Sequence, residues 1–234
     1  MPKFKYACFI SYRNSKAEAG ENTVFAEQLY EAIRDRVDSV LYNDLEDPDN
    51  HLVFLDKKVM GGGEFITTVL GQAICKSICW VVIFTRGYLR GSLWCASELE
   101  SMLKLEQQRL NALRMTNPLK SFIIPILFRG DKSDLPEVLQ NITFETKLAR
   151  FSLAFNRTTP ITNDAEMEPE IAKLIDEIVH REKMILDCTP LDEGLCQDCD
   201  KFVLVNVMEQ EGRQKIQDFV HDLKRRTPPP MAHS

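Results

Sequence analysis

Short apolar runs alternate with helical patterns through most of the chain, and this alternation constrains the fold more than any other feature. The run YACFIS at residues 6–11 is almost continuously apolar, as expected of a strand covered on both faces. Further apolar runs predict strands at residues 51–56, 79–85, 122–128 and 150–155. Apolar residues at helical spacing lie between and after them, within residues 25–33, 66–74, 99–113 and 171–178. This alternation predicts an α/β fold with a doubly wound, mainly parallel, five-stranded sheet.

The pattern changes after about residue 187. KFVLVNVM at residues 201–208 predicts a strand, and residues 212–226 predict a helix that ends in basic residues. The proline-rich tail, TPPPMAHS, adds no packed element. With 234 residues and 44% hydrophobic content, the chain can form one domain and an appendage. We therefore expect a main domain at residues 1–187 and a small strand-helix extension at residues 188–234.

Composition argues against several kinds of partner. The net charge is -6, and no basic stripe is interleaved with aromatic residues, so we expect no nucleic acid partner. No window of about 18 apolar residues exists, so we expect no membrane partner. Of seven cysteines, Cys8, Cys75 and Cys79 lie in apolar runs, where cysteine behaves as a small buried hydrophobe. We predict a reducing, cytoplasmic compartment and no structural disulfides.

Common catalytic motifs are missing from the sequence. It contains no GxxxxGK[ST] phosphate loop, no HExxH zinc motif and no GxSxG nucleophile elbow. Cys196 and Cys199 form a single C-x-x-C pair near Cys188, and free thiols are favoured over a metal site completed by His180. We predict neither a metal nor a bound cofactor.

Polar and aromatic residues gather where the predicted strands end. In an open α/β sheet, ligands bind outside the carboxyl ends of the strands. The residues at these ends are Ser11, Tyr12 and Arg13 after the first strand, Asp56 after the second, and Trp94 and Glu98 on the helix after the third. A glycine run, MGGGEF, ends at Phe65. This set would suit a ligand that combines flat rings with phosphates.

Three segments in this order resemble the Toll/interleukin-1 receptor (TIR) domain family. They are CFISYR, VFLDKKVMGGGEF and AICKSICWVVIFTRGYLRGSLWCASEL, and the resemblance spans roughly residues 4 to 185. The third segment is especially similar to plant and bacterial members, and the chain resembles the TIR proteins of bacterial antiphage systems such as Thoeris. The resemblance implies a flavodoxin-like TIR fold.

Some TIR domains cleave NAD at the nicotinamide-ribose bond. In those members the catalytic residue is the glutamate of a tryptophan-x-x-x-glutamate helix, which falls on Glu98. The resemblance implies that NAD is a substrate, so that no cofactor is needed. The residues expected to border it are Ser11, Tyr12, Arg13, Asp56, Gly63, Phe65 and Trp94. Among these, Asp56 is expected to be structural, and Gly63 and Phe65 match a mobile loop that closes over the nicotinamide.

Two alternatives stay open at this stage. Judged by residue type alone, Glu98 is better explained as a helix cap, with Ser97 also able to cap, and the resemblance reverses this preference. The second alternative is a non-enzymatic scaffold that acts by TIR-TIR association. The enzyme hypothesis predicts nicotinamide release and either ADP-ribose, a cyclic isomer or a conjugate. It also predicts self-association and a downstream effector that senses the product.

Overall fold

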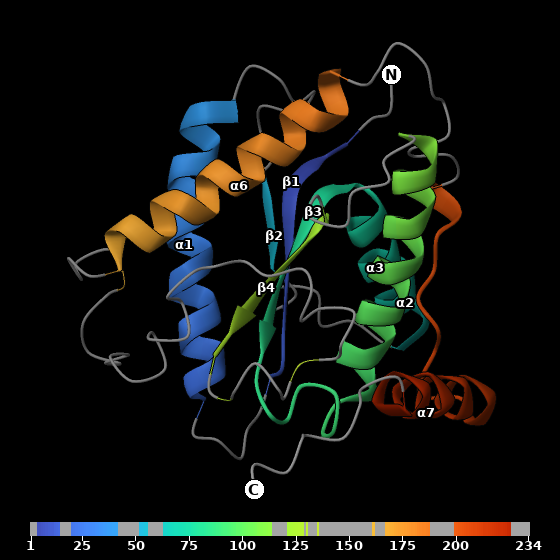
Figure 1. The fold of residues 1–234 in the computed structure, drawn as a ribbon. Helices are drawn as coiled ribbons and strands as arrows, with labels where there is room; N and C mark the ends of the chain where they lie inside the picture. Colours follow the sequence, from blue (N-terminus) through green and yellow to red (C-terminus); the bar gives the residue numbers. More distant parts are fainter. Residues whose placement is uncertain are drawn as a thin grey trace, which may run out of the picture.

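The computed structural model describes residues 4–14, 20–41, 52–55, 63–113, 121–128, 130, 135, 161, 167–187 and 199–225, and for residues 38 and 63–65 only the backbone. These residues form one parallel sheet between two layers of helices (Figure 1). The predicted parallel α/β class is therefore confirmed. The predicted strand at residues 150–155 lies outside the described residues.

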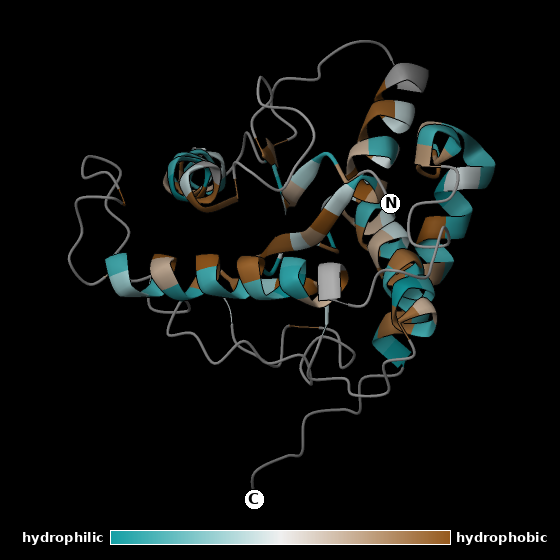
Figure 2. Ribbon diagram, turned by 90° about the horizontal axis from the view of Figure 1, so that it is seen from above, coloured by the Kyte–Doolittle hydropathy of each residue, from teal (hydrophilic) through white to brown (hydrophobic). Residues whose placement is uncertain are grey.

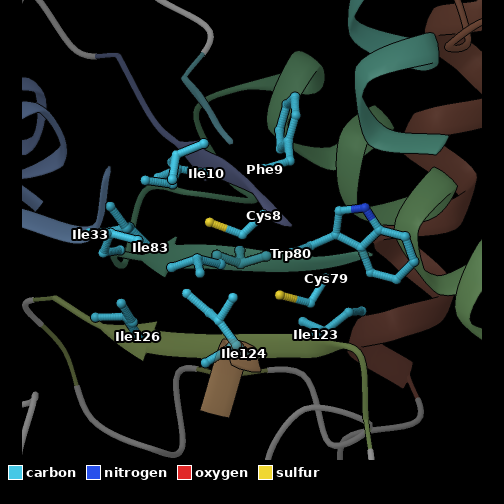
Figure 3. Packing of buried hydrophobic residues seen from close by; sticks show 14 of the residues in the cluster. Cys8, Phe9, Ile10, Ile33, Cys79, Trp80, Ile83, Ile123, Ile124 and Ile126 are labelled. Atoms are coloured by element: carbon cyan, nitrogen blue, oxygen red, sulfur yellow. The ribbon is translucent and has the colours of Figure 1, made fainter. Parts of the chain in front are cut away.

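The described part of the sheet has the strand order β2-β1-β3-β4. Its strands are β1 Tyr6–Tyr12, β2 Val53–Leu55, β3 Ser77–Phe84 and β4 Ile123–Leu127. All neighbours are parallel, with Phe9 opposite Phe54 on one side and Trp80 on the other. Every residue of β3 is buried, because helices cover this inner strand on both faces. Figure 3 shows the apolar side chains of β1, β3 and β4 packed together, with Ile33 of a neighbouring helix among them.

The direction of the strand connections decides which helix covers which face. Helices α1 Glu21–Leu41 and α6 Glu168–Asp187 pack on one face, and α2 Gly63–Cys75 and α3 Leu93–Ala112 on the other (Figure 1). The chain moves one way along the sheet from β1 to β2 and the opposite way to β3 and β4. Right-handed crossovers then place α1 opposite α2 and α3. The reversal lies between β1 and β3, where open α/β sheets bind ligands.

The helices that cover the sheet present apolar residues to it. Figure 2 shows apolar and polar residues alternating along the helices, and in α1 the buried positions include Phe25, Leu29 and Ile33. These residues recur every four positions, so they share one face of a helix. Among the described residues, no helix has a stretch long and apolar enough to cross a membrane.

The C-terminal extension differs from its prediction. Its described part consists of a short 3-10 helix, η6 (Cys199–Lys201), a non-helical segment at residues 202–206 and helix α7 (Gln210–Arg225). The predicted strand at residues 201–208 is wrong, because this segment lies across α2 and α3 and not at a sheet edge. Isolated hydrogen bonds hold it there: the Leu204 amide donates to the Thr67 carbonyl at 3.1 Å, and Ser97 Oγ donates to the Val205 carbonyl at 3.1 Å.

A disulfide joins this extension to the main domain. Cys75, the last residue of α2, is bonded to Cys199, with 5.4 Å between the two Cα atoms. The prediction of a chain without structural disulfides is therefore wrong. Cys75 is buried as predicted, but its surroundings include a second cysteine from a distant segment. A disulfide is typical of oxidising compartments, so the cysteines no longer support a reducing, cytoplasmic location.

Candidate active site

Helix α3 begins with a serine cap, and Glu98 plays no part in it. Ser92 is the N-cap, and its Oγ accepts a hydrogen bond from the Cys95 amide at 3.2 Å. The helix starts at Leu93 and has no acidic residue in its first turn, so Glu98 lies in the second turn. Ser97 bonds to Val205 and is not a cap either. The cap explanation of Glu98 is therefore wrong.

Glu98 is buried and bonded to the carboxyl end of β1. The residue is 3% exposed, and its Oε2 accepts a hydrogen bond from Ser11 Oγ at 2.5 Å. Ser11 is the next-to-last residue of β1, so the sheet positions its hydroxyl at the predicted ligand-binding edge. The structure thus brings together two residues that are 87 positions apart in the sequence.

Tyr88 is a third member of this site that sequence reasoning missed. It lies in the turn between β3 and α3, it is fully buried, and its hydroxyl is 2.5 Å from Ser11 Oγ. Burial raises the pKa of the Tyr88 hydroxyl well above its ordinary value, and the nearby Cys95 and Glu98 raise it further, while the bond to Ser11 acts in the opposite direction. The sequence did contain a signal for Tyr88. It lies in TRGYLRGS, part of the third segment that resembles TIR domains, directly after a buried strand.

Arg13 lies against the same turn. A Cβ atom added to Gly87 would lie 1.7 Å from Arg13 Nη1, and one added to Gly91 would lie 2.5 Å from Arg13 Nη2. The absence of side chains at these two glycines therefore makes room for the half-buried guanidinium. Arg13 is therefore held at the edge of the sheet where Ser11 and Glu98 meet.

Tyr12 and Trp94 are placed differently from their neighbours. Tyr12 is buried in the main core, and its carbonyl accepts a weak hydrogen bond from Cys95 Sγ at 3.5 Å. Trp94 is half-buried and packs against a second apolar cluster, called here the C-terminal cluster: Ala96, Val207, Ile216 and Val220. The first turn of α3 therefore contacts the extension, whereas Glu98 in the next turn contacts β1.

Asp56, Gly63 and Phe65 are the remaining predicted site residues. Asp56 lies outside the described residues. Gly63 begins α2 and Phe65 lies in its first turn, and only their backbone is described. Within the described part of the chain, no group of three or more histidine, cysteine, aspartate or glutamate side chains is arranged to hold a metal ion.

Comparison with known families agrees with this architecture. A model of the TIR domain family matches residues 5–181, which is more than half of the 234 residues, and the chain belongs to this family. The matched range includes every predicted site residue and excludes the segment from Cys199 to Arg225. The comparison with curated proteins gave no match. The family resemblance is thus confirmed, while the similarity to antiphage TIR proteins stays a prediction.

Proposed function

We propose that this TIR domain is an enzyme that cleaves NAD at the nicotinamide-ribose bond, with Glu98 as its catalytic residue. One observation carries the proposal: a buried carboxylate on α3 is bonded to Ser11 at the carboxyl end of β1. This place is the switch point of the sheet, where open α/β folds bind ligands. Glu98 is also the glutamate of the tryptophan-x-x-x-glutamate pattern in a chain that belongs to a family including NAD-cleaving members.

One carboxylate is sufficient for this reaction. Enzymes that cleave O-glycosidic bonds use two carboxyl groups, because the leaving oxygen must be protonated. Nicotinamide in NAD carries a positive charge, takes both electrons of the C–N bond and leaves as a neutral molecule. Positive charge then develops on the ribose, and an ionised carboxylate stabilises it. When water is the acceptor, its oxygen bonds to the ribose carbon and its proton goes to solvent, which gives ADP-ribose.

The other residues have supporting roles in this proposal. Arg13, held by its glycine turn, binds the pyrophosphate, since a guanidinium pairs well with phosphate oxygens. Phe65 shapes the nicotinamide and ribose pocket, and Gly63 permits close approach. For Tyr12 and Trp94 to border the same pocket, they must turn away from the main core and the C-terminal cluster, where this conformation places them. Ser11 bonds to the catalytic carboxylate. Asp56 has a structural role.

The wider proposal follows the family resemblance. We assign residues 1–187 to the TIR domain and residues 188–234 to an extension. The product is ADP-ribose, a cyclic isomer or a conjugate, and it serves as an immune signal sensed by a downstream effector in antiphage defence. Activity requires self-association through TIR surfaces, which is typical of the family.

One observation favours the second candidate function, a non-enzymatic scaffold. Ser11, Tyr88 and Glu98 are all buried, and Ser11 is bonded to both of the others, so the carboxylate is covered in this conformation. A scaffold needs no access to Glu98, whereas the enzyme must expose it to NAD. The two functions therefore differ in what they require of the same three side chains.

Replacing Glu98 with glutamine tests the enzyme proposal. Glutamine keeps an acceptor for Ser11 but removes the charge that stabilises the ribosyl cation. We expect Glu98→Gln to lower kcat for NAD cleavage at least about 100-fold. The assay follows NAD loss at high protein concentration, with a crowding agent to drive assembly, and identifies the products by chromatography and mass spectrometry.

Glu106→Gln is the matched control on the same helix. Glu106 is also buried and accepts a hydrogen bond from a serine, Ser121, but it lies two turns beyond Glu98. We expect this variant to keep wild-type activity. If the folded wild-type protein leaves NAD intact under all these conditions, the enzyme proposal is wrong and the scaffold is favoured.

A further inference from the structure

Three buried polar groups from three separate segments form one chain of hydrogen bonds. Ser11 is the next-to-last residue of β1, Tyr88 lies in the turn after β3, and Glu98 lies on α3. The two contacts, Tyr88 to Ser11 and Ser11 to Glu98, are both 2.5 Å long. Tyr88 and Ser11 are 0% and 1% exposed, so bulk water does not compete with either bond. The packing around them is apolar, which strengthens such bonds.

The direction of these hydrogen bonds follows from counting protons. A serine hydroxyl has one proton, and Ser11 donates it to the Glu98 carboxylate. Ser11 Oγ can then only accept from Tyr88, so the tyrosine hydroxyl is the donor of the second bond. Burial raises the pKa of the Tyr88 hydroxyl, which therefore keeps its proton at physiological pH. Every donor in the chain thus points toward the carboxylate.

We propose that Tyr88 and Ser11 are positioning residues that hold Glu98 in one orientation and in its charged form. Ser11 acts on Glu98 directly, and Tyr88 acts through Ser11 by polarising its hydroxyl. This inference rests on the proposed NAD-cleaving function, for which the charged form of Glu98 is the active one. It adds a residue, Tyr88, that is not needed for contact with the substrate.

Other groups near the carboxyl end of β1 also bear on the charge of Glu98, among them the half-buried cation Arg13. The C-terminal cluster and β4 face α3 with apolar side chains. Of α2, the charged Glu64 has no described side chain. The turn after β3 contributes Tyr88, Arg86 and Arg90, the end of β1 contributes Arg13, and α3 contributes Cys95. Further ionisable residues lie on the same elements: Tyr6, Cys8 and Tyr12 on β1, Cys79 on β3, and Glu100, Lys104, Glu106 and Arg109 on α3. Of these, Arg86, Arg90 and Lys104 are exposed.

The competing explanation is that these three hydrogen-bonded groups have a purely structural role. Buried polar groups need partners, and a buried carboxylate without one is strongly destabilising. Well-packed apolar residues in the same places are, however, often as stable as a satisfied polar cluster. A structural role predicts an effect on stability alone, whereas positioning predicts an effect on the titration of Glu98 and on kcat.

Tyr88→Phe is the sharpest test, because it removes one oxygen and keeps the ring. Loss of the donor weakens the bond from Ser11, so the charged form of Glu98 is less favoured and the carboxylate protonates at higher pH. We expect the acidic limb of the pH profile of kcat/KM to move up by about one pH unit. We also expect kcat to fall about tenfold at neutral pH with little change in KM.

Variants of Ser11 test whether Tyr88 acts on Glu98 through Ser11. Ser11→Ala removes the direct donor and should reduce kcat more than Tyr88→Phe does, while Ser11→Thr keeps a hydroxyl and should retain more activity. The Ser11→Ala, Tyr88→Phe double variant should match Ser11→Ala alone, because Tyr88 acts only through Ser11. The matched controls are Tyr6→Phe and Ser77→Ala, at the opposite ends of β1 and β3, and they should keep the wild-type pH profile.

A second readout separates this inference from the proposed function. NMR of protein labelled with ¹³C at the glutamate carboxyl carbons follows the titration of Glu98 directly, and Glu98→Gln identifies its signal. A higher midpoint together with reduced kcat in Tyr88→Phe supports the inference. An unchanged midpoint in the folded variant overturns it, whatever the activity. A raised midpoint in a protein that never cleaves NAD overturns the proposed function, and with it the catalytic part of this inference, but leaves the hydrogen-bond chain standing.

Discussion

Arg13 illustrates how a single side chain constrains distant residues. Its guanidinium occupies the space beside Gly87 and Gly91, two positions more than 70 residues later in the chain. Neither glycine has the left-handed backbone conformation that would by itself require glycine. The reason for these glycines is therefore the arginine beside them, which links the ends of β1 and β3.

Gly87→Ala tests this contact. The added methyl group would meet Arg13 Nη1, which is the end of a flexible side chain, so the guanidinium moves and the backbone does not. We expect a change of less than about 1 kcal/mol in the free energy of unfolding. If Arg13 binds the pyrophosphate, KM for NAD should rise about three- to tenfold.

The control for this variant is Arg13→Ala. It should raise KM by a similar factor, and the two changes together should give no further increase, because both remove the same contact. Unchanged KM in the folded Gly87→Ala and Arg13→Ala proteins would exclude Arg13 from the substrate site.

At the scale of elements, α2 and the segment at residues 202–206 fit together through another glycine. A Cβ atom at Gly71 would lie 2.6 Å from the Phe202 carbonyl oxygen and 2.9 Å from the Leu204 amide nitrogen. These are backbone atoms, and a side-chain rotation does not relieve the clash. The segment also bonds to Thr67 on α2 and Ser97 on α3, so it lies close against both helices.

Gly71→Ala should therefore be destabilising. Within an exposed helix, replacing glycine with alanine is stabilising by about 1 kcal/mol. Here we expect the free energy of unfolding to fall by about 1–3 kcal/mol, because the methyl group displaces the segment. Urea unfolding measures the change, and hydrogen exchange at the Leu204 amide reports the displacement. Gly87→Ala is the matched control, and a higher urea midpoint in Gly71→Ala would contradict this packing.

At the scale of the whole molecule, the Cys75–Cys199 disulfide ties the extension to the TIR domain. The bonded residues are 124 positions apart. A cross-link over so long a stretch restricts the unfolded chain strongly, which favours the folded state. Around it, the Gln72 side-chain amide donates to the Asp200 carbonyl at 2.6 Å, and Lys76 pairs with the Asp200 carboxylate. The extension is thus fixed at η6 and again at the C-terminal cluster.

Cys199→Ser tests the contribution of this bond. We expect the free energy of unfolding to fall by roughly 2–5 kcal/mol. In chemical denaturation, a reducing agent should shift the midpoint of the wild-type protein to that of Cys199→Ser, and should leave the variant unchanged. A wild-type midpoint that does not respond to the reducing agent, with both cysteines shown to be reduced, would contradict the prediction.

The parts of the fold that sequence reasoning predicted well are those set by local patterns. The continuous apolar run of β3 indicates a strand buried on both faces, and the spacing of Phe25, Leu29 and Ile33 indicates a helix. The same reasoning failed for residues 201–208, which have the composition of a strand but no sheet edge to pair with. The residue types common in strands favour an extended backbone. Whether an extended segment joins a sheet depends on whether another strand lies beside it.

The sequence by itself determined the parallel α/β class, the order of its elements, the family and the place of Glu98 on the helix after the third strand. Only the tertiary structure decided that Tyr88 and Ser11 bond in series to Glu98, and that Cys75 pairs with Cys199. Hydrophobic periodicity is a property of neighbouring residues and is visible in a single sequence. Hydrogen bonds and disulfides join atoms from segments 77 to 124 positions apart, and the folded chain alone brings those segments within bonding distance.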